Sequence, residues 1–216
     1  MKKVTSKIVL VMTIFLVGCE KEKKIEPVAL KSTKKVISKS EKEIAVITTQ
    51  YGDMVIEFYN RAAPKHVESF KLHVKNGFYN GTIFHRVIPG FMIQGGDPNT
   101  KGNNKSIYGQ GGHSAKYYGI GLEDKPKSWN IPAEFNDIKH TRGILSMARS
   151  NDRNSAGSQF FICDAAASHL DAQYTVFGKV VEGLEIIDRI VNMPRDDNNN
   201  PLSRVEMKVR LEKRDI

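Results

Sequence analysis

The chain has 216 residues, which is enough for one folded domain with appendages. Its formal net charge of +9 is concentrated near the N-terminus, since three lysines in residues 1–18 and a net three charges in residues 19–43 leave three for the rest. No aromatic residue is interleaved with the lysines of residues 19–43, so the composition argues against a nucleic-acid-binding protein.

Residues 1–18 have the pattern of a bacterial export signal, with three lysines before a short apolar stretch, Ile8 to Val17. As a helix this stretch covers about 15 Å, half of a bilayer core of about 30 Å, so a membrane-spanning helix is not expected. It ends in Leu16-Val17-Gly18-Cys19, which resembles the lipobox of bacterial lipoproteins. That resemblance implies cleavage before Cys19 and acylation of its thiol. An ordinary signal peptide cut at another bond is the alternative.

A multiply acylated Cys19 would anchor the protein durably in a membrane of the bacterial cell envelope, on its periplasmic or extracytoplasmic face. Cys163, the second cysteine, lies in an apolar run and is expected to be a small buried thiol. With Cys19 acylated, no intrachain disulfide can form.

Residues 19–43 are predicted to form a charged flexible tether. They combine lysine, glutamate and serine with isolated apolar residues, a composition that cannot build a core. A coiled coil is the alternative, but no heptad pattern runs through the segment. As a flexible coil it would reach about 25–30 Å.

Residues 44–216 are predicted to form the folded domain. Strands are expected at residues 45–49, 54–58, 82–87, 91–94, 143–148, 159–162, 175–180 and 205–211. Helices are expected from Pro64 to just before Gly77, and over 184–191 with an apolar stripe of Leu184, Ile187, Ile190 and Val191. Many strands with two helices indicate a mainly β fold, a closed antiparallel eight-stranded barrel capped by two α-helices.

A long polar, glycine-rich loop insertion occupies about residues 98–131. A phosphate-binding loop is one interpretation, but neither a Gly-Lys-Ser/Thr sequence nor a GxGxxG pattern follows a strand here. A surface excursion is therefore preferred. Tyr117, Tyr118 and Trp129 are expected to hold it against the body of the domain.

Two sequence blocks carry the chemistry: residues 84–97, FHRVIPGFMIQGGD, and residues 143–163, GILSMARSNDRNSAGSQFFIC. The first places an arginine, Arg86, before an apolar pair and an amide, and its glycines allow sharp turns on both sides. The second adds further apolar and amide side chains. Together the blocks resemble the cyclophilin family of peptidyl-prolyl cis-trans isomerases, over about residues 44–216. The resemblance implies a barrel fold and isomerase activity on X-Pro bonds, here of exported proteins folding in the cell envelope.

Rotation about an X-Pro bond must cross a barrier of about 18–20 kcal/mol, because amide resonance is lost midway. Acceleration from tens of seconds to milliseconds requires about 5.5 kcal/mol less barrier. No covalent bond is made or broken, so no nucleophile, metal or cofactor is needed. The reaction needs a dry proline pocket and a donor that favours the twisted amide. Arg86 fits the donor, because its guanidinium offers several fixed N–H groups.

Gln94 joins Arg86 as a catalytic residue that fits a hydrogen bond to the substrate backbone, and Gln159 is a weaker candidate for the same role. The resemblance implies that Ala148-Arg149-Ser150 correspond to a backbone-binding segment that is usually Ala-Asn-Ala. Substrate-binding positions are Phe91, Met92, Ala148, Arg149, Ser150, Gln159, Phe161, His169, Leu170 and Tyr174. The substrates are proline-containing polypeptides, and the protein is expected to act as a monomer.

Three departures from the family pattern affect the expected binding. Arg149 and Ser150 replace Asn-Ala, His169 stands where many members have tryptophan, and Tyr174 stands where histidine is frequent. The tryptophan is associated with tight cyclosporin binding, so drug sensitivity is not implied. Tyr174 still offers an aromatic face and a hydroxyl to the pocket.

Other readings of the same residues remain open at this stage. Arg86 could be a structural ion-pair residue, and His85 and His140 are expected to be hydrogen-bonded structural histidines. A serine hydrolase is disfavoured because residues 112–116, GHSAK, break the GxSxG pattern. A proline-peptide binding module with little turnover is the second hypothesis, and the departures around Arg86 are its support.

Overall fold

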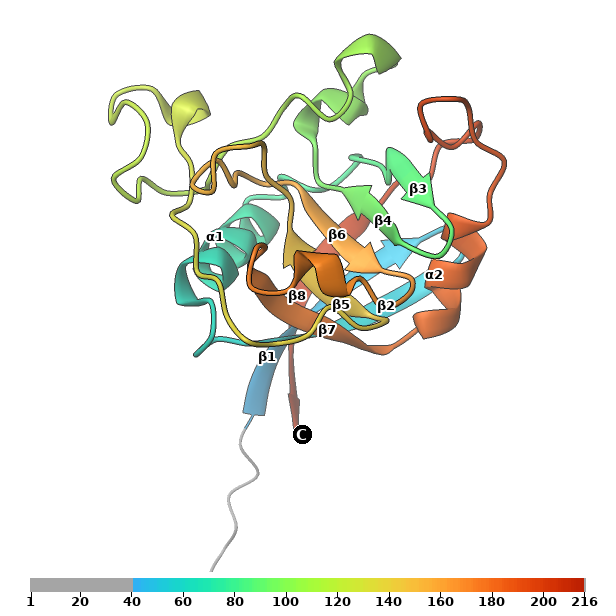
Figure 1. The fold of residues 1–216 in the computed structure, drawn as a ribbon, viewed down its shortest axis with the longest axis horizontal. Helices are drawn as coiled ribbons and strands as arrows, with labels where there is room; N and C mark the ends of the chain where they lie inside the picture. Colours follow the sequence, from blue (N-terminus) through green and yellow to red (C-terminus); the bar gives the residue numbers. More distant parts are fainter. Residues whose placement is uncertain (1–40, 216) are drawn as a thin grey trace, which may run out of the picture. The chain divides into compact units, whose positions relative to one another are not determined.

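The structure is a computed structural model that describes residues 41–215, and this part of the chain is mainly β (Figure 1). Cys19, the signal segment and the tether up to residue 40 lie outside the described residues. The strands are β1 (Glu41–Thr49), β2 (Gly52–Phe58), β3 (Arg86–Ile88), β4 (Met92–Gly95), β5 (Ile144–Met147), β6 (Phe160–Cys163), β7 (Val176–Glu182) and β8 (Lys208–Asp215). The helices are α1 (Pro64–Lys75) and α2 (Leu184–Val191), with short 3₁₀ turns η1 (Pro98–Lys101), η2 (Lys105–Ile107), η3 (Pro126–Ser128) and η4 (Ser168–Leu170).

Each predicted strand and helix has a counterpart, and the bounds of α2 agree with the prediction. Two strand boundaries differ in a way that matters. β1 begins at Glu41, so residues 41–43 belong to a strand and not to the tether, because they pair with the end of β8. β8 begins at Lys208 instead of Val205.

The eight strands form one antiparallel sheet in the order β3-β4-β6-β5-β7-β2-β1-β8. No ladder joins the edge strands β3 and β8, so the prediction of a barrel closed by its strands is wrong in that respect. The two edges are linked by a single bridge between Ile83 and Glu206 and by backbone hydrogen bonds around it. A full ladder cannot form there because the N–H of Val87, on β3, donates to the carbonyl of Asn199 in a loop.

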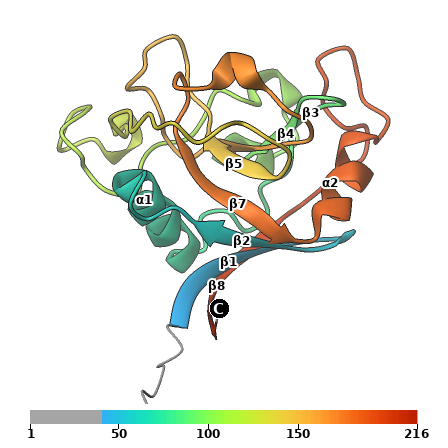
Figure 2. The same cartoon turned by 60° about the horizontal axis from the view of Figure 1, so that its bottom comes forward.

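The two helices cover opposite ends of the sheet (Figures 1 and 2). Helix α1 starts at Pro64, whose fixed φ suits the first helical position, and its buried face packs near β7 and β8. Helix α2 buries Ile186, Ile187, Ile190 and Val191 near β2, β3 and β4. The predicted stripe is wrong for its first member, because Leu184 is exposed at the start of the helix.

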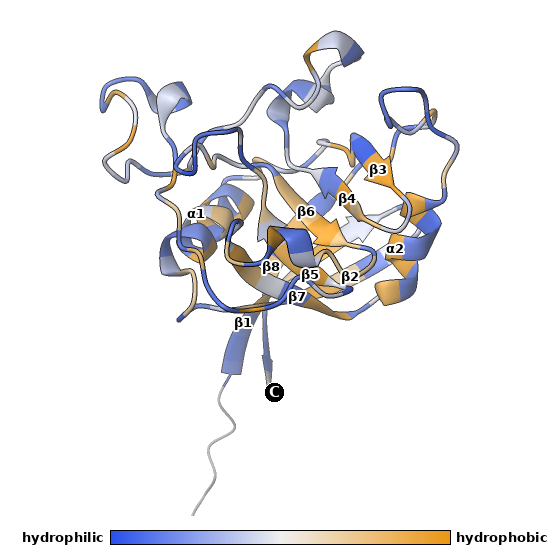
Figure 3. Ribbon diagram, in the orientation of Figure 1, coloured by the Kyte–Doolittle hydropathy of each residue, from blue (hydrophilic) through white to orange (hydrophobic). Residues whose placement is uncertain are grey.

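Alternation along the strands divides the buried apolar side chains into three clusters, two of which meet at β6. On β6, Phe160 and Ile162 join the main core inside the curved sheet, whereas Phe161 and Cys163 join a second cluster on its outer face. Figure 3 shows apolar colour along most of the strands and on part of both helices, whereas the insertion is largely polar. The second cluster therefore offers an apolar floor outside the main core.

The insertion is held against α1 by side chains of that helix. The N–H of Ala115 donates to Ser69, and a ring nitrogen of His73 lies 2.8 Å from the carbonyl of His113. Tyr118 donates to Glu68 at 2.9 Å, which confirms the prediction for this tyrosine.

Tyr117 and Trp129 do not hold the insertion to the domain as predicted. Their rings lie 5.9 Å apart, and the indole N–H of Trp129 donates to the Leu122 carbonyl. Both therefore stabilise the tip of the insertion itself. Among the described residues, no helix combines the length and apolar character needed to cross a bilayer.

Candidate active site

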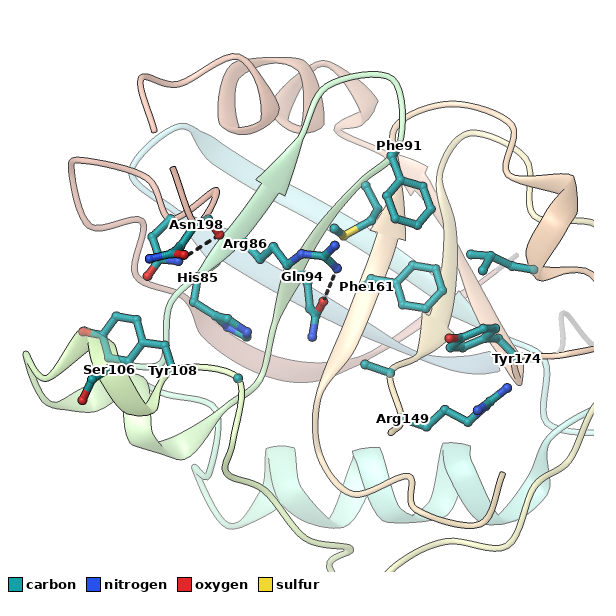
Figure 4. A pocket seen from close by; sticks show the side chains of 15 residues that line it. His85, Arg86, Phe91, Gln94, Ser106, Tyr108, Arg149, Phe161, Tyr174 and Asn198 are labelled. Carbon is teal, nitrogen blue, oxygen red and sulfur yellow. Dashed lines mark hydrogen bonds between the residues drawn. The ribbon is translucent and has the colours of Figure 1, made fainter. Parts of the chain in front are cut away.

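A groove with a cavity of about 530 Å³ lies on the outer face of the sheet, over β3, β4 and β6 (Figure 4). Nine of the twelve residues predicted for the substrate site line it together. They are Arg86, Phe91, Met92, Gln94, Ala148, Arg149, Phe161, Leu170 and Tyr174. Residues from five separate segments of the chain therefore meet in one place.

Strand register explains why these side chains share a face. Arg86 on β3 pairs with Gln94 on β4, Gln94 pairs with Phe161 on β6, and Phe161 pairs with Ser146 on β5. Side chains that lie directly opposite each other in a sheet point to the same side. The pairing thus sets an arginine, an amide and an aromatic ring in one row.

One end of the groove is apolar and shielded from water. Met92, Phe161 and Leu170 form its floor and are at most 7% exposed. The ring of Tyr174 meets Phe161 edge-on, with 5.9 Å between ring centres. Phe91 is half-buried at the rim. The shape and chemistry suit a small apolar ring such as that of proline.

His140 supports this floor from beneath. Its ring stacks on Phe161 with centres 6.0 Å apart, one ring nitrogen lies 3.0 Å from the Ser146 hydroxyl, and the other lies 3.1 Å from Asp171. Burial lowers the pKa of His140, although Asp171 acts in the opposite direction. The prediction of a hydrogen-bonded structural histidine is confirmed for His140.

A chain of hydrogen bonds fixes Arg86 at the centre of the groove (Figure 4). Arg86 donates to Gln94 at 3.3 Å, and Gln94 donates to Gln159 at 3.0 Å. Gln159 in turn donates to the carbonyls of Gly109 and Gly111 in the insertion. The side-chain oxygen and nitrogen of both glutamines are therefore occupied within the protein.

The guanidinium of Arg86 has donors to spare. Within residues 41–215 its one hydrogen bond is to Gln94, and no carboxylate forms an ion pair with it. The alternative of a structural ion-pair residue thus finds no partner in the described part of the chain. A guanidinium has five N–H donors, so most of them can face a bound peptide.

The side chain of Arg149 stabilises the wall of the groove. Its guanidinium donates to the Gln173 and Ser150 carbonyls and lies 4.4 Å from the centre of the Tyr174 ring. The main-chain N–H and carbonyl of Arg149 have no hydrogen-bond partner among residues 41–215. Its side chain therefore braces Tyr174, while its backbone is available to an extended peptide.

Three predicted residues lie outside the main cavity. Ser150 and Gln159 line an adjacent cavity of about 230 Å³, together with Ala148 and Arg149. His169 lines neither cavity, because the turn η4 directs Leu170 into the groove and leaves His169 exposed, with its ring 5.5 Å from Phe91. Its position is behind the rim.

The other half of the cavity is lined by residues that the sequence reasoning did not place in the site: His85, Ser106, Tyr108, Gly109, Asn198 and Asn200. The Asn198-Asn199-Asn200 run was visible in the sequence, but no pattern connected it to Arg86.

His85 is 3% exposed, and neither of its ring nitrogens has a hydrogen-bond partner among the described residues. The predicted hydrogen bond of His85 is therefore not formed at bonding geometry. Burial lowers its pKa to about 4, although Asp97 and the nearby Ile83 carbonyl act in the opposite direction.

The described residues show no group of histidine, cysteine or carboxylate side chains arranged to hold a metal ion. Cys163 is free and buried, as predicted, and burial raises the pKa of its thiol to about 12. A thiol in that state is a poor nucleophile.

Known proteins resemble this chain over most of the folded domain. Residues 44–210 match the family described as cyclophilin type peptidyl-prolyl cis-trans isomerase/CLD. A peptidyl-prolyl cis-trans isomerase of Acinetobacter baylyi is 43% identical over 152 residues, which cover 68% of this chain and 70% of that protein. The peptidyl-prolyl cis-trans isomerase-like 1 protein of Emericella nidulans is 41% identical over 160 residues, 74% of this chain and 88% of that protein.

A solved structure shows the same likeness. The crystal structure of a Cryptosporidium parvum cyclophilin type peptidyl-prolyl cis-trans isomerase, in the presence of the dipeptide Ala-Pro, has a TM-score of 0.67 and 34% identity to this chain. The match covers 78% of this chain and 98% of that one.

Proposed function

The chain belongs to the cyclophilin-type family of peptidyl-prolyl cis-trans isomerases, and we propose that it accelerates X-Pro rotation with Arg86 as its catalytic residue. The observation that carries this assignment is an arginine with free donors fixed beside a dry apolar pocket. The proline ring lies on Met92, Phe161 and Leu170. In that pose the Arg86 guanidinium faces the amide whose resonance is being lost.

Arg86 lowers the barrier by stabilising the twisted amide more than the planar one. Once resonance is broken, the amide nitrogen gains electron density and accepts a hydrogen bond that the planar nitrogen accepts poorly. A charged donor in a site that excludes water strengthens such a bond. Because the donor is held in place before the substrate arrives, little reorganisation is needed at the moment of rotation.

Gln94 acts through Arg86 in this proposal. Its amide oxygen accepts from Arg86 and its amide nitrogen donates to Gln159, so it orients the guanidinium. The unpartnered backbone of Arg149 aligns the peptide next to the proline pocket. Proline-containing polypeptides are the substrates, in line with the Ala-Pro dipeptide named for the Cryptosporidium parvum structure.

The test of this assignment is an exchange assay on a short X-Pro peptide. Arg86→Ala should lower kcat/KM at least tenfold, with the unfolding transition unchanged, because the donor is lost while the pocket remains. Equal rates for the two proteins would refute the role of Arg86. Peptide binding without acceleration by the wild-type protein would favour the binding-module alternative.

We further propose that the protein acts in a bacterial cell envelope, held at a membrane by acylated Cys19 and assisting the folding of exported proteins as a monomer. The support is the order of lysines, a short apolar stretch and Leu16-Val17-Gly18-Cys19 at the start of the sequence. Several acyl chains give durable membrane attachment, whereas one gives marginal attachment.

Cys19→Ala tests the anchor in cells that express the full chain. The variant should move from the membrane fraction to the soluble fraction, because the acylated thiol is lost. Cys163→Ala is the matched control, since that cysteine is buried in the folded domain and should leave fractionation unchanged. An unchanged distribution of Cys19→Ala would contradict lipidation at this residue.

A further inference from the structure

The groove continues past Arg86 on the side away from the proline pocket. Figure 4 shows Arg86 in the middle, with Phe91 and Tyr174 to one side and Asn198 and Tyr108 to the other. This second half, called here the far half, is lined by His85, Ser106, Tyr108, Gly109, Asn198 and Asn200. The mechanism proposed for Arg86 uses none of these residues.

Two loops form the far half, and they are tied to each other. Lys105 in η2 forms an ion pair with Asp196 at 3.3 Å. The Asp196 carboxylate also accepts the backbone N–H groups of Asn198 at 3.0 Å and Asn200 at 2.9 Å. These contacts hold the asparagine-bearing loop in one conformation opposite the insertion. The far half is therefore built before a ligand arrives.

His85 is the clearest sign that the far half binds something polar. Its ring is almost fully buried, it lines the cavity, and both ring nitrogens lack a partner among residues 41–215. Buried polar atoms are nearly always hydrogen-bonded, and leaving one unpaired is costly. A neutral imidazole offers one donor and one acceptor, which matches an amide or a peptide group.

Asn198 adds an amide at the surface of the same half. It is exposed, and its side chain makes no hydrogen bond within the described residues, whereas its backbone N–H is held by Asp196. The amide is thus free on a loop that is fixed. Apart from Arg86 at the boundary, the residues that line the far half carry no charged side chain. Lys105 and Asp196 are not part of this lining, and they form an ion pair with each other.

We propose that the far half is a subsite for part of the substrate, namely the segment on the side of the proline away from residues 148–150. This subsite selects an uncharged hydrogen-bonding residue such as glutamine or asparagine. The proposal rests on the isomerase function assigned above. A basic residue there would meet the Arg86 guanidinium without gaining a partner, and an apolar residue would leave His85 unpaired.

The test uses X-Pro peptides extended by two residues before or after the core, with glutamine or leucine in the extension. With the extension on the side that enters the far half, kcat/KM for the glutamine peptide should be at least fivefold higher than for the leucine peptide. Asn198→Ala and His85→Phe should each reduce that ratio at least threefold. Asp197→Ala, an exposed change in the same loop outside the cavity, should retain the wild-type ratio.

Thermal unfolding of His85→Phe is measured alongside, and Asn198→Ala decides the matter if the buried change unfolds the protein. Ratios near one on both sides, or a ratio preserved in Asn198→Ala, would overturn the subsite. If no peptide is accelerated, the isomerase assignment fails instead, and calorimetric affinities of the same four peptides then decide the subsite. A glutamine preference in affinity that Asn198→Ala abolishes would support it, and equal affinities would overturn it.

Discussion

Arg86 owes its position to residues that are distant in the sequence. Gln94 holds the guanidinium, Gln159 holds Gln94, and the carbonyls of Gly109 and Gly111 hold Gln159. The orientation of the Arg86 guanidinium therefore depends on the insertion. A glutamine is suited to this relay, because its amide accepts at one atom and donates at the other.

Replacing Gln159 tests the relay. Gln159→Leu should lower kcat/KM about three- to tenfold, since losing one buried hydrogen bond costs about 1 kcal/mol and a tenfold rate change corresponds to about 1.4 kcal/mol. The effect should fall mainly on kcat, because Arg86 loses alignment while the proline pocket stays intact. Gln50→Leu, an exposed change in the turn after β1, is the control. A Gln159→Leu enzyme with wild-type kcat would contradict the relay.

The sequence was sufficient to predict most single residues of the apolar half, because Phe91, Met92 and Phe161 lie in contiguous motifs and Leu170 follows the second motif closely. It could not predict the far half. The loop that carries Asn198 is placed at the groove by a backbone hydrogen bond between Val87 and Asn199, which are more than a hundred residues apart in the sequence. Nor could it predict that His169 turns outward, since that depends on one 3₁₀ turn.

Helix α1 illustrates the same dependence for a whole element. Ala63, the residue before the helix, provides no side-chain cap, and the Glu134 carboxylate accepts the N–H groups of Lys65 and His66 instead. The His66 ring adds a contact at 2.7 Å. A carboxylate at a helix N-terminus is stabilising, since it meets unpaired N–H groups and the positive end of the helix dipole.

Glu134→Ala should therefore destabilise the domain by about 1–2 kcal/mol, the usual range for a lost cap. Burial opposes ionisation, but the His66 ring and the backbone N–H groups outweigh it and keep the pKa of Glu134 below its ordinary value of 4.5. A lowered carboxylate pKa means that the contribution is full above about pH 4.5 and is lost below it. Urea unfolding at pH 7 measures the difference against Glu123→Ala, an exposed change in the insertion. No loss of stability in Glu134→Ala would contradict the cap.

Periodicity predicted the core of each helix and strand, but distant contacts set several boundaries. Pro64 and Gly77 located α1 in the sequence, and no local signal identified Glu134 as its cap. Residues 41–43 look like tether in the sequence, yet they extend β1 because β8 provides hydrogen-bonding partners. Pairing of this kind depends on the partner strand and not on local composition.

Across the whole domain, the groove lies between the sheet and two loops, the insertion and the asparagine-bearing loop. The prediction of eight antiparallel strands was correct, while closure of the barrel was not, because loops and not strands meet between β3 and β8. Buried histidines of this domain include His73 on α1, His85 in the lining of the groove and His140 against Phe161. Burial lowers the pKa of His73 and of His85 to about 4 and also lowers that of His140.

These histidines make stability depend on pH. The unfolded chain binds protons at histidine near pH 6.5, whereas the folded domain resists them to lower pH, so stability is complete above about pH 6.5 and falls toward pH 4. The loss at pH 5 should be on the order of 2 kcal/mol for each of His73 and His85. Urea unfolding at pH values from 7 to 5 should show that the free energy of unfolding falls less steeply with pH in His73→Gln than in the wild-type protein. A flat wild-type profile would contradict the expected burial effect.

We propose that Arg86 acts on the twisted amide and not on the bound peptide in its planar state. The most direct measurement compares kcat with the Kd of one X-Pro peptide, by NMR exchange, in the wild-type protein and in Arg86→Ala. An interaction made mainly in the transition state changes the rate more than the affinity. We predict at least a tenfold lower kcat with a Kd changed less than threefold. A tenfold weaker Kd with unchanged kcat would show that Arg86 merely binds the substrate and would contradict this account.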